Sequence, residues 1–78
     1  METRLLKCLD IVRDITDLGV PSDYPPLKQL SKRLSDYVKS GESWSGRIMF
    51  EEYGRYADIV LPSRHDRDIQ VVLRNINR

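Results

Sequence analysis

The sequence has few of the residues on which secreted, metal-binding and membrane-spanning proteins depend. Its single cysteine, Cys8, cannot form an intramolecular disulfide, which excludes a disulfide-stabilised secreted domain. Its single histidine, His65, lies far along the chain from Cys8, whereas zinc needs three or four ligands, normally in spaced pairs. No stretch has the make-up of a signal peptide, and the apolar runs are far shorter than a membrane span. We therefore expect no metal and no cofactor, and a location in the cytoplasm or nucleus.

An excess of charge of one sign is also absent. The 13 Lys and Arg residues oppose 12 Asp and Glu residues, for a formal net charge of +1 at pH 7. A balance so near neutrality produces no net field that would attract nucleic acid or an anionic membrane. With 78 residues, the chain is expected to form a single small α+β domain over 1–78, near the size at which one core is only marginally stabilising.

The spacing of the apolar residues changes at Gly41. Before it they recur at helical spacing, and after it Trp44, Ile48 and Phe50 alternate with polar residues as in a strand. Helices are expected over about 3–18 and 25–40, and strands over 44–51, 56–61 and 69–74. This order predicts two N-terminal helices packed on one face of a three-stranded antiparallel meander, α-α-β-β-β.

The apolar face of the first helix covers about half of its circumference, which suits a helix buried against both a neighbour and a sheet. Its members are Leu5, Cys8, Leu9, Ile11, Val12, Ile15 and Leu18. The predicted core of the whole chain is Ile11, Val12, Ile15, Leu30, Leu34, Ile48, Phe50, Ile59 and Val71. Trp44 shares the inner face of the first strand, so it is interpreted as a core residue rather than a stacking platform.

The strand registers follow from side-chain alternation, because a one-residue slip would turn polar residues into the core. We expect Ile48 to pair with Ile59, leaving a four-residue loop over 52–55, and Ile59 to pair with Val71. On the outer face, Met49, Val60 and Val72 are then expected to lie close together. They would form a partly apolar interaction surface.

The loop over 63–68 carries the densest set of functional groups in the chain. Arg64 and Arg67 offer planar guanidinium groups and His65 can gain charge near neutral pH, so the loop is one candidate for binding an anion or a partner. The alternative is a solvated turn in which aspartates bond the local backbone. A hairpin loop rarely holds three adjacent side chains inward, so no catalytic triad is predicted here and the chain is not expected to be an enzyme.

The second helix carries a basic set of side chains that could follow a phosphate backbone. These are Lys28, Lys32 and Lys39, with Arg33 to one side. Asp36 interrupts them, and the first helix carries compensating aspartates, so a solvated helix face explains the same residues.

The prolines that open the second helix stand in a short motif, Tyr24-Pro25-Pro26-Leu27. It resembles the YPxL motif with which some viral structural proteins recruit the ESCRT-associated adaptor Alix, and the resemblance implies an adaptor as partner. Prolines at a helix start account for the same four residues without a partner. No family is recognised over the length of the chain.

Together these patterns predict a non-catalytic protein–protein interaction module with an assembly or regulatory role, homodimeric through the sheet. The open sheet edges and the outer-face residues Met49, Val60 and Val72 motivate this hypothesis. The alternative is a small RNA- or DNA-binding protein that uses the basic side of the second helix together with Arg64 and Arg67. Phosphate contacts would make such binding fall steeply with salt, which separates the two hypotheses.

Overall fold

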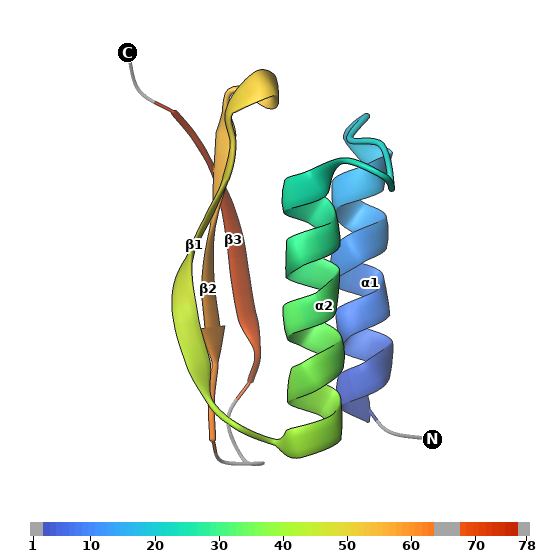
Figure 1. Ribbon diagram of the computed structural model, residues 1–78, viewed down its shortest axis with the longest axis vertical. Coiled ribbons are helices and arrows are strands. Elements are labelled where there is room, and N and C mark those ends of the chain that lie inside the picture. Colours follow the sequence, from blue (N-terminus) through green and yellow to red (C-terminus); the bar gives the residue numbers. More distant parts are fainter. Residues whose placement is uncertain (1–2, 64–67, 77–78) are drawn as a thin grey trace. The chain divides into compact units, whose positions relative to one another are not determined.

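The computed structural model describes residues 3–63 and 68–76, and it shows two helices followed by a three-stranded antiparallel sheet (Figure 1). The elements are α1 (Thr3–Asp17), α2 (Pro25–Ser40), β1 (Trp44–Phe50), the short 3-10 helix η1 (Glu51–Tyr53), β2 (Arg55–Leu61) and β3 (Gln70–Asn75). The α+β class and the element order predicted above are confirmed. The chain divides into two compact units, Met1–Gly41 and Glu42–Arg78, which are described in turn.

In the helical unit, α1 and α2 run antiparallel and lie side by side (Figure 1). The first helix ends one residue before the predicted limit, and Gly19 follows it with a φ of 99°. The second helix begins at Pro25, whose ring presets φ for the first turn. It ends where Gly41, with a φ of 71°, donates its backbone N–H to the Tyr37 carbonyl at 2.8 Å.

The buried side of α1 is much narrower than its apolar face. Cys8 and Ile15 are buried, at 5% and 1% exposure, but Leu5, Leu9 and Leu18 are 40%, 57% and 53% exposed. The prediction that the whole apolar half of this helix is buried is therefore wrong. A helical wheel reports how wide the apolar face is, but not which part of it other side chains cover. In α2 the buried residues follow the predicted stripe: Leu27, Leu30, Leu34 and Tyr37.

In the sheet unit the strand order is β1-β2-β3, with both pairings antiparallel. Ile59 pairs with Val71, as predicted. The predicted β1–β2 register is wrong by two residues, because Ile48 pairs with Ala57 rather than with Ile59. The chain reverses earlier than expected, through η1, and Gly54 closes this turn with a φ of 65°. A shift of two residues leaves every side chain on its predicted face.

The inner face of the sheet alternates with the outer face as expected. Its buried side chains are Ile48, Phe50, Ala57, Ile59 and Leu61. Trp44 lies on the same face and its indole covers Gly46, where an added Cβ would approach the Trp44 Cζ2 atom to 2.8 Å. Glycine is thus required at position 46 for this ring position. Of the nine predicted core residues, six are buried, and Ile11, Val12 and Val71 are partly exposed.

The central strand provides a direct test of this core. Ile59 is 1% exposed, and replacing it by Ala removes buried methyl groups and leaves a cavity. We expect Ile59→Ala to lower the free energy of unfolding by about 2–5 kcal/mol in a chemical denaturation experiment. The matched control is Val60→Ala on the same strand, because Val60 is 45% exposed and its truncation should change stability by no more than about 0.5 kcal/mol. Equal losses in the two variants would contradict the assignment of faces.

Candidate functional site

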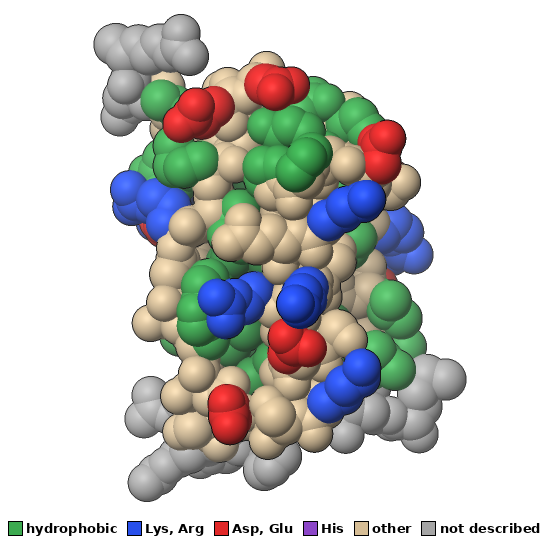
Figure 2. All heavy atoms as spheres, viewed as in Figure 1, with side chains coloured by type: hydrophobic (Ala, Val, Ile, Leu, Met, Phe, Trp, Pro, Cys, Tyr) green, Lys and Arg blue, Asp and Glu red, His purple; other side chains and the backbone are tan. Residues whose placement is uncertain are grey.

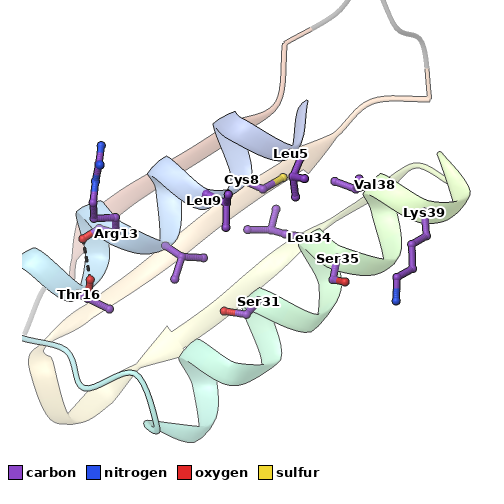
Figure 3. A pocket seen from close by; sticks show the side chains of 11 residues that line it. Leu5, Cys8, Leu9, Arg13, Thr16, Ser31, Leu34, Ser35, Val38 and Lys39 are labelled. Carbon is purple, nitrogen blue, oxygen red and sulfur yellow. Dashed lines mark hydrogen bonds between the residues drawn. The ribbon is translucent and has the colours of Figure 1, made fainter. Parts of the chain in front are cut away.

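The helical unit contains an apolar groove between α1 and α2, with a volume of about 570 Å³ (Figure 3). We call it the α1–α2 groove. Residues from both helices line it: Leu5, Cys8, Leu9, Val12, Arg13 and Thr16 from α1, and Ser31, Leu34, Ser35, Val38 and Lys39 from α2. Figure 3 shows Leu5 beside Val38 and Leu9 beside Leu34, with their side chains directed into the space between the helices.

Short side chains stand beside large ones on the α2 side of the groove. Ser31 and Ser35 line it together with Leu34 and Val38, and on the α1 side Leu5 and Leu9 stay 40% and 57% exposed. Leu34, at 2% exposure, belongs to the buried floor. Exposed leucines beside this buried floor form an apolar surface that water contacts unfavourably.

Arg13 and Lys39, which line the groove, each belong to a line of residues with the spacing i, i+4, i+7, i+11 along one side of a helix, and we call these lines the α1 rim and the α2 rim. The α1 rim consists of Leu6, Asp10, Arg13 and Asp17, and the α2 rim consists of Lys28, Lys32, Ser35 and Lys39. On the α1 rim, Arg13 forms an exposed ion pair with Asp10 at 3.1 Å, which leaves the charge of Asp17 as the excess. By formal charge the α1 rim is net acidic and the α2 rim is basic, but the charged side chains that line the groove itself, Arg13 and Lys39, are both basic.

The three apolar residues predicted for the outer face of the sheet are exposed, but they do not form one cluster. Val60 pairs with Gln70, one diagonal step from Val72. Met49 pairs with Tyr56, four residues along β2 from Val60, or about 13 Å at the usual rise of a strand. The expectation that all three lie together is wrong, because it depended on the incorrect β1–β2 register.

A charged cluster centred on Asp58 occupies the middle of this outer face. Arg47 on β1 donates its Nε–H to Asp58 Oδ1 at 2.8 Å, and the Nε of Arg74 on β3 lies 3.3 Å from Asp58 Oδ2. The Arg47 guanidinium also stacks over the Tyr56 ring, 4.2 Å from its centroid. The hydrogen bond from Arg47 holds the pKa of Asp58 below its usual value, and that bond also raises the pKa of Arg47.

The basic residues of α2 do not all lie together. Lys28, Lys32 and Lys39 share the α2 rim, whereas Arg33 lies about a quarter turn away from it. Lys32 and Arg33 border a polar hollow of about 280 Å³ whose lining includes Asp36. Figure 2 shows acidic side chains among the basic ones on the face in view. Positive charge is thus interrupted where a phosphate backbone would need it to be continuous.

The remaining predicted site residues belong to the loop over 63–68 and to the YPxL-like motif. Arg64, His65 and Arg67 lie outside the described residues. In the YPxL-like motif, Tyr24 precedes α2 in an extended conformation, but Leu27 lies inside the helix at 1% exposure. The leucine of the motif is therefore not accessible to a partner in this structure.

The part of the chain that the structure describes contains no group of three or more His, Cys, Asp or Glu side chains placed to hold a metal ion. Within the same residues, no helix combines the length and the apolar character needed to cross a membrane. Comparison with protein-family models, with curated proteins and with solved structures found no match. We therefore infer function from the physical chemistry of this chain.

The Asp58 cluster predicts a pH dependence of stability. A carboxylate whose pKa is lower in the folded than in the unfolded state contributes stability above its unfolded pKa, and this contribution is lost as the pH falls through the folded pKa. We expect stability to fall with pH below about 4, the ordinary range for Asp, and Asp58→Asn to reduce the slope of that fall. Thermal melts between pH 2 and pH 7, with Asp14→Asn as an exposed control, measure this slope. An unchanged slope in Asp58→Asn would show that the cluster does not form in solution.

Proposed function

We propose that this protein is a non-catalytic interaction module with an assembly or regulatory role, and that it binds its protein partner through the α1–α2 groove. The observation that carries the proposal is the exposure of Leu5 and Leu9, 40% and 57%, above the buried floor of a 570 Å³ groove. Amphipathic helices are the usual ligands of such grooves, because their apolar side chains fill the space while their polar residues meet the rims. Small polar side chains at Ser31 and Ser35 leave room for them.

The groove is favoured over the outer face of the sheet, which was the surface predicted from the sequence. There, Asp58 and its two arginine partners separate Met49 from Val60, so a partner would have to cover three charged groups to reach all of the apolar residues. Burial of charged groups costs free energy unless the partner replaces their interactions with water. In the groove, Arg13 and Lys39 are at the boundary of the lining and its centre is apolar.

The lysines of the α2 rim favour nucleic-acid binding as the second candidate function. Lys28, Lys32 and Lys39 recur on one side of a helix and could contact successive phosphates. Against this, Asp36 is exposed beside them, and the opposite rim carries Asp10 and Asp17. The same lysines are equally able to contact acidic side chains of a protein partner whose apolar helix face lies in the groove.

The two functions are separated by a capture experiment in the native host with tagged protein. We expect Leu9→Glu, which places a charge in the groove, to reduce the amount of captured protein partner at least tenfold. An untagged copy of the same chain counts as such a partner. Val72→Glu on the outer sheet face is the matched control and should leave capture unchanged, since Leu9 and Val72 are both exposed, at 57% and 44%. Both substitutions should change stability by no more than about 0.5 kcal/mol, which a thermal melt verifies.

The opposite pattern, with loss in Val72→Glu alone, would contradict the groove and support the sheet. Capture of nucleic acid that is insensitive to Leu9→Glu and declines steeply with salt would instead support the second candidate function.

A further inference from the structure

We infer that the partner of the α1–α2 groove is an amphipathic helix of a different protein, which carries an acidic residue near each end of its apolar stripe, on opposite sides of that stripe. This inference rests on the proposed function, because it gives the chemistry of the partner that the same groove binds. It follows from three properties of the groove: the sign of the charges in its lining, the accessibility of those charges, and their distance apart.

The charges in the lining of the groove have one sign. Among the described residues that line it, the charged ones are Arg13 from α1 and Lys39 from α2, and the others are uncharged. A helix that fills the apolar part of the groove and brings a carboxylate to each cation is attracted at both points, whereas a helix with lysines there is repelled. The groove therefore favours an acidic partner helix over a basic one.

The ion pair between Arg13 and Asp10 leaves Arg13 able to bind a second carboxylate. The pair joins Arg13 Nη2 to Asp10 Oδ1 at 3.1 Å, and a guanidinium group has five N–H donors. The two side chains are 69% and 62% exposed, and ion pairs so exposed to solvent contribute little free energy. Lys39 is also exposed, and it has no ion-pair partner among the residues that the structure describes. Both cations are thus accessible to a partner.

The two cations lie at opposite ends of the apolar part of the groove, one on each helix (Figure 3). Because Leu5 lies beside Val38 and the helices are antiparallel, Lys39 is at a level about one residue before Leu5 along α1. At the other end, Arg13 follows Val12, the last apolar lining residue of α1. The cations are therefore about nine residues apart along the helix direction, or about 13–14 Å at 1.5 Å per residue.

These positions determine the sequence pattern of the partner helix. Two residues nine positions apart on a helix are separated by about two and a half turns, so they lie on opposite sides of it. One acidic residue can then contact Arg13 on α1 while the other contacts Lys39 on α2. With apolar residues at i, i+4, i+7 and i+11 facing the groove, the acidic positions are i+1 and i+10. Turning the helix end for end exchanges the two acidic residues and leaves this pattern unchanged.

Two other occupants fit this lining less well. The acidic residues of the two helices are Asp10, Asp14 and Asp17 in α1 and Asp36 in α2, and no two in one helix are nine positions apart. A second copy of the chain therefore does not supply the pattern. A fatty acid would fill the apolar space, but it has a single charge at one end and can contact only one of the two cations.

Synthetic helical peptides of about 18 residues, long enough to form a helix, test the inference. The probe has leucines at i, i+4, i+7 and i+11 and glutamates at i+1 and i+10, and two matched peptides carry glutamine or lysine at those two positions. In a fluorescence anisotropy titration with the full chain, we expect the glutamate peptide to bind on the order of tenfold more tightly than the lysine peptide, with the glutamine peptide between them. Lys39→Glu should abolish this preference. The control Arg33→Glu, at an exposed position of α2 outside the groove lining, should retain it.

Three results would overturn the inference, with thermal melts used to verify that the variants are folded. They are a glutamate peptide that does not bind at up to about 1 mM, a lysine peptide that binds as tightly as the glutamate peptide, and a preference for glutamate that persists in Lys39→Glu. Laurate that binds in a manner sensitive to Leu9→Glu, while no peptide binds, would identify a fatty-acid site instead.

The inference and the proposed function fail in different ways. If the peptides show no preference for glutamate while Leu9→Glu still abolishes capture of a protein partner, the inference fails and the proposed function stands. If Leu9→Glu changes neither peptide binding nor capture, the proposed function fails as well.

Discussion

The turn between β1 and β2 is the constraint from which the surface properties of the sheet follow. Because Glu51–Tyr53 forms a 3-10 turn closed by Gly54, the strands pair with Ile48 opposite Ala57. That register sets Arg47 opposite Asp58, and β3 brings Arg74 to the same carboxylate. The outer face is consequently centred on a charged cluster rather than on an apolar patch.

In the helical unit, the equivalent determinant is the size of the side chains on α2. Ser31 and Ser35 line the groove beside the larger Leu34 and Val38, and Leu5 and Leu9 of α1 stay exposed. The serines cause no loss of helix formation, because tertiary packing supplies most of the stability of a helix in a protein. Short side chains leave more open space between two helices than long ones would, and here that space is part of the apolar groove.

The charges around the groove have a consequence for specificity. The charged side chains that line the groove, Arg13 and Lys39, are both basic, and they disfavour a basic partner surface, so exposed leucines do not imply indiscriminate association. The near-neutral net charge of the chain, +1, thus conceals a separation of charge within the helical unit. Composition alone therefore does not show where the charges lie in the folded chain.

The sequence by itself determined the element order, the faces of the strands and the helix end at Gly41, because these features follow from local periodicity and backbone preference. Only the tertiary structure decided the β1–β2 register, since a shift of two residues preserves the alternation from which the register was predicted. It also decided which part of the apolar face of α1 is buried: Leu9 and Ile15 are equally apolar in the sequence, but at 57% and 1% exposure they have opposite roles. Exposure depends on which positions of a helix other segments of the chain cover, and periodicity within one helix does not contain that information.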